Sequence, residues 1–182
     1  MEERKKTTVA VFIDNENLRR ALATESILFS DCAVCDYLAE EFGPIVLGKT
    51  YWAFGREGDQ RSFPGAKVPQ LFKRGVEIVL VPSFYDGSSE KNLADGKITI
   101  DVLQYLEYYP TIELWVIVSN DKDFLPLLQE LRRRGKKVLL IYSQDTRILL
   151  ESCERLGIEN IQYQNIMPRT YLVQESYSQG RF

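Results

Sequence analysis

The sequence predicts an α/β fold in three layers, with a mostly parallel central sheet covered by helices on both faces. Short apolar runs rich in β-branched residues alternate along the chain with stretches of helical periodicity, which is the pattern of βαβ units. Several of these runs are apolar throughout, as expected of parallel strands that are buried on both faces. The length of 182 residues and the apolar content of 45% suit one domain with a sizeable core.

The strands are predicted where such apolar runs occur, the first of them close to the N-terminus. The second expected strand follows Pro44 and carries alternating aromatic residues, and the others are shorter and nearly all apolar. The predicted strands are residues 9–13, 45–54, 76–81, 112–118 and 138–142, with a short last strand at 161–163.

The helices are predicted between the strands, where apolar residues recur at helical spacing. Three of them end at Gly75, Gly135 and Gly157, since glycine adopts the left-handed conformation that often follows a helix. The predicted helices are residues 17–24, 31–41, 69–74, 92–108, 123–134 and 146–156. Residues 56–67 and 85–91 are polar and contain glycine, so we expect loops there. The predicted domain covers residues 8–167, followed by a C-terminal tail at 168–182.

Composition excludes several classes of chemistry. The chain has no histidine, which removes histidine-based triads, histidine general bases and most zinc sites. Its net charge of −3 lacks the basic signature of a dedicated nucleic-acid binder, but a bound metal ion could carry the contact with phosphate. Three cysteines, Cys32, Cys35 and Cys153, are expected to be reduced thiols. The chain shows no signal-like or membrane-spanning apolar segment, so we expect a cytoplasmic protein.

Four aspartates fall where the predicted fold brings them together. Asp14 ends the first strand, Asp121 and Asp123 follow the strand at 112–118, and Asp95 lies near the start of the helix at 92–108. Carboxylates that converge at one sheet edge repel each other unless a cation joins them, and they are the hard oxygen ligands that Mg²⁺ and Mn²⁺ prefer. The sequence therefore predicts a divalent metal site.

Helix capping is the alternative explanation for each of these residues taken singly. Asp14 or Asn17 could cap the first helix, Asp123 could start the helix at 123–134, and Asn92-x-x-Asp95 has the spacing of a capping box. Capping requires one such residue per helix, however, and leaves the additional polar residues at each strand end unexplained.

Asp101 adds a fifth carboxylate on the same long helix. At about 100° per residue, Asp95 and Asp101 lie roughly 60° to either side of Ile98, which belongs to the apolar stripe of the helix. Both aspartates can therefore flank the buried face. Because they lie about 120° apart, one of them is expected to contact the metal more directly, and Asp95 is nearer the sheet edge.

Three segments in order resemble the signatures of the NYN domains, in particular the LabA-like branch of the PIN-like nuclease superfamily. The similarity spans about residues 8–163. Asn120 departs from it, because the family usually has glycine there. The matching segments are Phe12-Ile13-Asp14-Asn15-Glu16-Asn17, then Lys91-Asn92-Leu93-Ala94-Asp95 with Ile100-Asp101, and then Ser119-Asn120-Asp121-Lys122-Asp123-Phe124-x-Pro126-Leu127.

The resemblance implies a Rossmann-like, PIN-like fold and Mg²⁺- or Mn²⁺-dependent cleavage of RNA. Asn17 and Ser119 would position a water molecule or a carboxylate, and Asp101 would support the centre. The residues that would hold the metal and carry catalysis are Asp14, Asp95, Asp121 and Asp123.

Basic residues near these motifs are candidates for substrate contacts. Lys91, Arg56 and Arg61 could contact phosphates of a single-stranded RNA, with Tyr51, Trp52 or Phe54 available for base stacking. The alternative is that these are solvated loop cations and core aromatics. Further positive charge in the same region comes from Lys67, Lys73 and Arg74.

Two other functions are alternatives to an endoribonuclease. A non-catalytic adaptor would keep the fold, bind RNA or a protein, and bind metal weakly. A phosphatase of the haloacid dehalogenase type would need aspartate two positions after Asp14, where this chain has Glu16, so we discount it. The sequence leaves a homodimer open.

Overall fold

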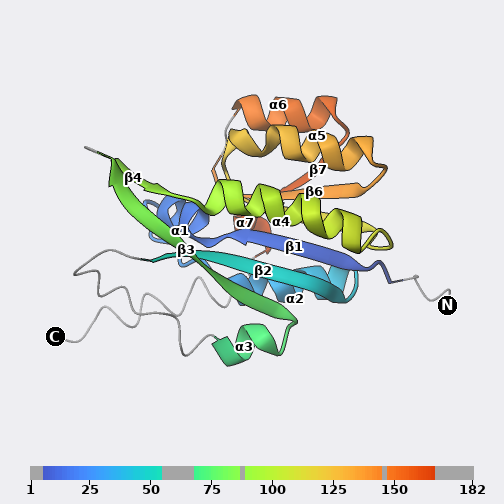
Figure 1. Ribbon diagram of the computed structural model, residues 1–182, viewed down its shortest axis with the longest axis horizontal. Helices are drawn as coiled ribbons and strands as arrows, with labels where there is room; N and C mark the ends of the chain where they lie inside the picture. Colours follow the sequence, from blue (N-terminus) through green and yellow to red (C-terminus); the bar gives the residue numbers. More distant parts are fainter. Residues whose placement is uncertain (1–5, 55–67, 87–88, 145–146, 167–182) are drawn as a thin grey trace.

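The chain forms one twisted sheet with helices on both faces (Figure 1). The computed structural model describes residues 6–54, 68–86, 89–144 and 147–166, with no side-chain detail for 84–86 and 89–92. Within these ranges the sheet has seven strands in the order β4-β3-β2-β1-β5-β6-β7. All neighbours pair in parallel except β3 and β4, which pair antiparallel.

The strands are apolar because the central ones are covered on both faces. Every residue of β1 and β5 is buried. The strands are β1 (Val9–Asp14), β2 (Ile45–Phe54), β3 (Val76–Asp86), β4 (Ser89–Asn92), β5 (Leu114–Val118), β6 (Lys137–Tyr142) and β7 (Glu159–Gln162).

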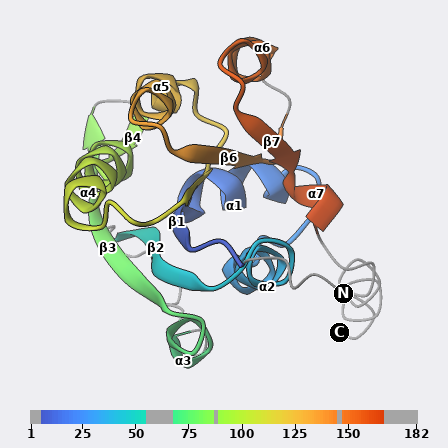
Figure 2. The same cartoon turned by 90° about the vertical axis from the view of Figure 1, so that its right-hand side faces the viewer.

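The helices form two layers, one on each side of the sheet (Figure 2). One layer holds α4 (Ala94–Tyr108), α5 (Leu125–Arg133) and α6 (Arg147–Arg155), and a short helix η1 (Lys122–Phe124) precedes α5. The other layer holds α1 (Asn15–Ala23), α2 (Asp31–Glu41), α3 (Val68–Phe72) and α7 (Tyr163–Ile166).

The order of the strands reverses next to β1. From β1 the chain adds β2 and β3 on one side, and then crosses through α4 to add β5, β6 and β7 on the other side. In open α/β sheets such a switch point opens a crevice outside the carboxyl ends of the strands, where ligands bind. The ends of β1 and β5 are therefore the place to look for a site.

The structure confirms the predicted α/β class and most of its elements, with boundaries that differ by a few residues. The expected loop at 85–91 is wrong: β3 continues to Asp86 and turns back into β4 as a hairpin. The polar strand β4 lies at the edge of the sheet, where it forms through backbone pairing with β3. The single helix expected at 123–134 is divided into η1 and α5, and the short α7 was not predicted.

Among the described residues, no helix is both long enough and apolar enough to cross a membrane. The predicted tail at 168–182 and the predicted loop at 56–67 lie outside the described residues, so the domain boundary at 167 remains a prediction.

Candidate active site at the carboxyl edge of the sheet

Asp14 is the centre of the site, because it is a buried carboxylate at the switch point. It ends β1 and caps α1, and only 3% of its surface is exposed. The backbone N–H of Asn17 donates to its Oδ1 at 3.3 Å, and the hydroxyl of Ser119 donates to its Oδ2 at 3.2 Å. Capping and a functional role are therefore compatible at Asp14, since capping uses only one of its two oxygens.

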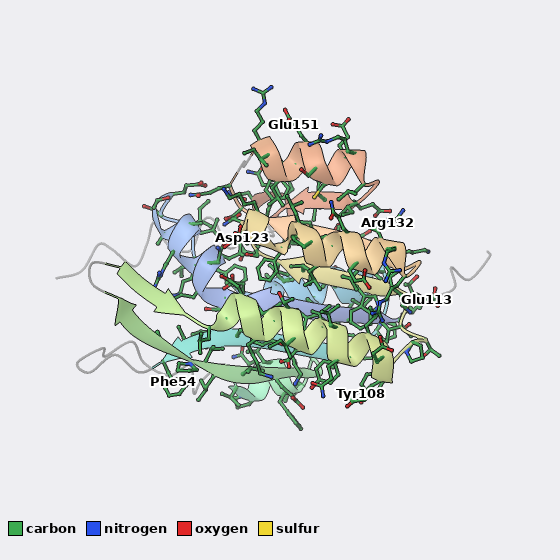
Figure 3. The ribbon with its side chains drawn as sticks, turned by 45° about the horizontal axis from the view of Figure 1, so that its top comes forward. Phe54, Tyr108, Glu113, Asp123, Arg132 and Glu151 are labelled. Atoms are coloured by element: carbon green, nitrogen blue, oxygen red, sulfur yellow. The ribbon has the colours of Figure 1, made fainter. Side chains whose placement is uncertain are left out.

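The segment after β5 presents two further aspartates. Ser119 continues from the strand, and its Oγ accepts the backbone N–H of Asp121 at 3.1 Å. Asp121 caps η1 by accepting the backbone N–H of Asp123 on its Oδ1 at 2.8 Å. Asp123 is exposed and lies, like Phe54, at the end of the molecule where the strands finish (Figure 3). Ser119 thus links the end of β5 to Asp14.

Asp95 reaches the same place from α4. It lies in the first turn of that helix and is partly buried. Burial raises the pKa of Asp95, and the negative charges of Asp121 and Asp123 raise it further, while a hydrogen bond with Asp14 opposes the rise. The structure therefore brings the four predicted aspartates into electrostatic contact.

The acidic cluster also changes the pKa of Asp14. Burial is the main cause that raises the pKa of Asp14 to about 7, and the charges of Asp95 and Asp121 raise it too, against the hydrogen bonds from Asn17 and Ser119. A buried carboxylate that faces other carboxylates must either take up a proton or bind a cation.

Asn17 and Asn120 fix the turn that carries Asp121. The backbone N–H of Asn120 donates to the side-chain oxygen of Asn17 at 2.9 Å. The side-chain oxygen of Asn120 accepts the backbone N–H groups of Ser143 at 2.7 Å and Gln144 at 3.0 Å, just after β6. Among the described residues only Ser26 combines a side chain with positive φ, so the backbone at Asn120 does not need glycine. The departure from the family pattern thus adds a link between β5 and β6.

Asp101 lies behind the cluster, with partners of its own. Tyr51 donates its hydroxyl to Asp101 Oδ2 at 2.8 Å, and Lys97 donates to Oδ1 at 2.5 Å. Tyr51 is also the register partner of Asp14 in the β1–β2 pair. Asp101 therefore ties α4 to the strand that lies beside Asp14, and among the described residues its hydrogen bonds go to Tyr51 and Lys97 rather than to the four aspartates. Lys97 was not singled out from the sequence, although its i,i+4 spacing to Asp101 is a helix-pair signal.

Most of the residues predicted to contact the substrate lie outside the part of the chain that the structure describes. Arg56 and Arg61 fall outside the described residues, as does the side chain of Lys91, whose backbone belongs to β4. Arg74 is described: its guanidinium donates to Asp36 at 2.7 and 2.9 Å. Because Arg74 comes just before β3 begins, it lies at the amino edge of the sheet, away from the aspartates.

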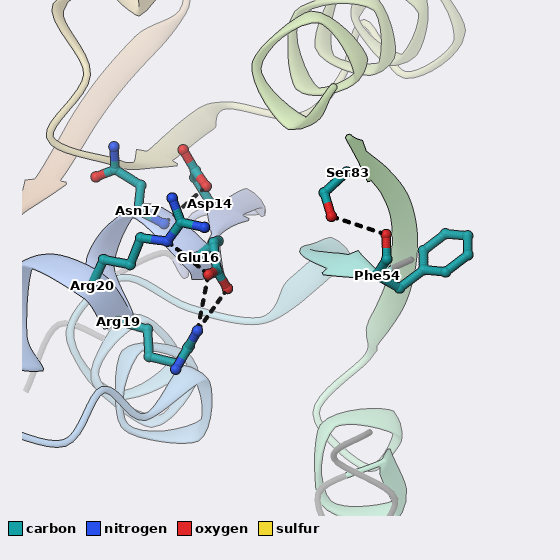
Figure 4. Close-up of polar contacts among 7 residues, drawn as sticks. All are labelled: Asp14, Glu16, Asn17, Arg19, Arg20, Phe54 and Ser83. Atoms are coloured by element: carbon teal, nitrogen blue, oxygen red, sulfur yellow. Dashed lines mark hydrogen bonds and ion pairs between the residues drawn. The ribbon is translucent and has the colours of Figure 1, made fainter. Parts of the chain in front are cut away.

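A second acidic residue follows Asp14 closely and was missed as a site component. Glu16, in the first turn of α1, is buried and accepts hydrogen bonds from Arg19 and Arg20 (Figure 4). Burial works to raise the pKa of Glu16, but the hydrogen bonds and charges of the two arginines outweigh it and lower that pKa. The i,i+3 and i,i+4 spacing was the available signal.

The chemistry of the donors fits a hard divalent cation. Four carboxylates supply oxygen ligands, and burial, together with the negative charges of neighbouring aspartates, raises the pKa values of Asp14 and Asp95. The side chains are not assembled into a ligand set, however: within the described ranges, no group of three or more acidic or cysteine residues has the geometry to hold an ion. Side-chain rotation would have to complete such a set.

Comparison with known families shows which family the chain belongs to. Residues 8–157 match the model of the NYN domain. The chain belongs to the NYN domain family. NYN domains are part of the PIN-like nuclease superfamily, so the three-layer architecture described above is a PIN-like sandwich. None of the proteins with curated records matches the chain.

Two solved structures are similar to this NYN domain to different degrees. One is a protein of unknown function from Vibrio parahaemolyticus, with 21% identity, a TM-score of 0.66, and coverage of 92% of this chain and 99% of that chain. Another, from Burkholderia pseudomallei, is described as related to pilus assembly and has 11% identity, a TM-score of 0.40, and coverage of 97% of this chain and 90% of that chain. The first similarity establishes fold alone, and the second is too weak to support an argument.

Proposed function

We propose that this NYN domain is a ribonuclease that hydrolyses RNA phosphodiester bonds with the help of Mg²⁺ or Mn²⁺. The observation that carries the proposal is Asp14, a buried carboxylate at the switch point whose pKa is raised to about 7 by burial and by neighbouring acids. The motifs around it favour the LabA-like branch of the family.

The residues of the site would have two roles, metal binding and positioning. Asp14, Asp95 and Asp121 would hold the cation, and Asp123, which is exposed beside them, would complete the ligand set. When bound, the metal would lower the pKa of a water molecule and neutralise charge on the phosphate. Ser119 and Asn17 would keep Asp14 and the turn after β5 in place, through the hydrogen bonds described above.

Four further residues would act at a greater distance from the metal. Asp101 supports the centre by holding α4 against Tyr51, beside Asp14. Lys91 contacts a phosphate of a single-stranded RNA. Arg56 and Arg61, in the segment after β2, would make similar contacts farther along the strand.

The test is cleavage of a mixed pool of RNA sequences in the presence of Mn²⁺. The wild type should fragment the pool, and EDTA or Asp14→Asn should abolish fragmentation. The matched control is Asp36→Asn, an exposed aspartate paired with Arg74 near the other edge of the sheet, which should leave fragmentation unchanged. Fragmentation that survives in Asp14→Asn would rule out this site.

A non-catalytic NYN adaptor that binds RNA or a protein partner is the second candidate. The observation that favours it is that the acidic side chains of the described residues are not assembled into a ligand set. It predicts that the wild type retains RNA in a binding assay but leaves the whole pool intact with Mn²⁺.

A further inference from the structure

Strand β3 has an open edge along its first half. Its outer neighbour β4 pairs only with residues 83–86, and no other described strand lies on that side of β3. Figure 1 shows β4 beside one end of β3 and α3 near the other end. Residues 76–81 therefore pair with β2 on one side and, among the described strands, with none on the other.

Pro82 identifies the backbone groups that point to the open side. Its C=O accepts the N–H of Leu93, directly after β4, at 3.4 Å, and proline has no N–H of its own to leave unpaired there. Backbone groups alternate in direction along a strand, so Leu80, Ile78 and Val76 direct their N–H and C=O groups to the same side as Pro82. Within the described ranges, no hydrogen bond joins these six groups to another segment. Groups of this kind are a template for the addition of a strand.

The side chains along this edge are apolar. Ile78 and Val76 pack on the face of the sheet that carries α3, and Leu80 shares that face by alternation. Leu80 is 47% exposed, and Phe72 of α3 is 78% exposed. Together with Val68, these side chains line a groove of about 290 Å³ formed by α3 and β3. An apolar groove beside open backbone groups is the combination that accepts an extended strand.

The charge of this edge is compensated within the chain. Glu77 is the one charged residue at positions 76–82, and its carboxylate pairs with Lys49 of β2 at 2.8 Å. Two such edges can therefore meet without bringing unpaired like charges opposite each other, which would destabilise the pairing.

We propose that the open edge of β3 pairs with the same edge of a second copy of this chain, forming a homodimer with its two-fold axis at Ile78. In this antiparallel arrangement Ile78 lies opposite the partner's Ile78, and Val76 lies opposite the partner's Leu80. Each open N–H then meets an open C=O. The inference is independent of the proposed ribonuclease activity, because it uses no residue of the acidic cluster.

The pattern of open groups specifies the register. A shift by two residues in one direction places Val76 opposite the partner's Pro82, which has no N–H and whose C=O is already paired. A shift by two in the other direction places Leu80 opposite the partner's Arg74, which lies before the strand begins. A shift by one residue opposes groups that face the edge to groups that face β2. The open segment is thus complementary to itself, which favours a second copy over an unrelated peptide.

The test measures the mass of the full chain by sedimentation velocity over a concentration series. As concentration rises, the wild type should change from the 21.1 kDa monomer to a species of twice that mass. Leu80→Lys should weaken dimerisation at least about a hundredfold, because the dimer buries this side chain twice. Phe72→Ser, at a second exposed position of the groove, should weaken it too.

Ile148→Lys is the matched control. Ile148 is 61% exposed on α6, which packs with β7 at the opposite edge of the sheet, so the same added charge should leave dimerisation unchanged. Thermal unfolding of each variant establishes that it is folded.

Amide hydrogen exchange shows which surface forms the dimer. The N–H groups of Ile78 and Leu80 should exchange slowly at concentrations where the wild type is dimeric and fast where it is monomeric, because only the dimer gives them acceptors.

Three results would overturn the inference: a wild type that stays monomeric at every concentration, a dimer in which these two amides stay unprotected, and equal dimerisation by the wild type and Leu80→Lys. RNA cleavage is assayed separately, and neither its presence nor its absence changes these expectations.

Discussion

Asp14 and Asp31 are both buried at the carboxyl edge of the sheet and both accept hydrogen bonds, but Asp14 also faces other carboxylates. Asp31 starts α2, and its two oxygens accept the side-chain amide of Asn15 at 3.0 and 2.9 Å and the hydroxyl of Thr50 at 2.7 Å. Asp14 instead faces Asp95 and Asp121. Asp14 and Asn15 are consecutive, but their side chains make contacts on opposite faces of the sheet.

The comparison teaches that burial of a carboxylate does not by itself mark a metal site. Asp31 is 1% exposed and Asp14 is 3% exposed, so burial cannot separate them. Both carboxylates accept hydrogen bonds, and what separates them is that Asp14 also faces the negative charges of Asp95 and Asp121. Asp31 therefore stabilises the fold as it stands, whereas Asp14 gains from a cation. Substitutions at Asp31 and at Asp14 test the two sides of this contrast.

The largest effect is expected at Asp31. Asp31→Asn places an amide where two donors need an acceptor, so the free energy of unfolding should fall by about 3 kcal/mol. Chemical denaturation measures the loss. Asp36→Asn, which removes one carboxylate from an exposed pair with Arg74, should cost less than about 1 kcal/mol. A loss of that small size at Asp31 would show that its network is not stabilising.

In the metal-free protein, Asp14→Asn should raise the free energy of unfolding, whereas Asp31→Asn lowers it. The pKa of Asp14 is raised from 3.8 to about 7, so the folded state holds a proton that the unfolded chain has released. The stability that this proton provides is complete below pH 4 and is lost as the pH rises through about 7.

Unfolding in EDTA between pH 4 and pH 8 tests this behaviour. The wild type should lose stability as the pH rises, and Asp14→Asn should flatten the curve and exceed the wild type by about 2 kcal/mol at pH 8, which lies within the roughly 4 kcal/mol that a rise of about three pKa units allows. Parallel curves for the two proteins would show that ionisation of Asp14 does not destabilise the folded state.

The acidic side of this contrast could be predicted from the sequence. Asp14, Asp121 and Asp123 follow apolar runs, and parallel strands place such residues at a common edge. Asp95 followed from its position at the start of the next helix. Strand periodicity and helix phase are local signals, so the four-residue cluster needed no knowledge of tertiary contacts.

The other side could not be predicted, because its contacts are not local. Asp31 looked only like the start of a helix, and its partner Thr50 lies 19 residues away on β2. The pairing of Asp101 with Tyr51, 50 residues apart, is equally non-local. The β3–β4 hairpin was missed because its polar residues carry no burial signal, and pairing at a sheet edge does not require one.

The smallest effect is expected at Asn120. Asn120→Gly restores the residue that the family usually has and removes the side-chain bonds to Ser143 and Gln144, so it should cost about 1 kcal/mol of stability. Thermal unfolding with and without Mn²⁺ should show the same metal-induced gain as in the wild type. A reduced gain would make Asn120 part of the metal site rather than a link between β5 and β6.

Calorimetric titration of chelator-treated protein with Mn²⁺ tests the central claim, that the carboxylates clustered at the switch point form the metal site. The wild type and Asp31→Asn, compared at a temperature where both are folded, should bind Mn²⁺ with the same affinity. Asp14→Asn should bind it at least about tenfold more weakly, a loss of about 1.4 kcal/mol or more. Equal Mn²⁺ binding by the wild type and Asp14→Asn would contradict the account.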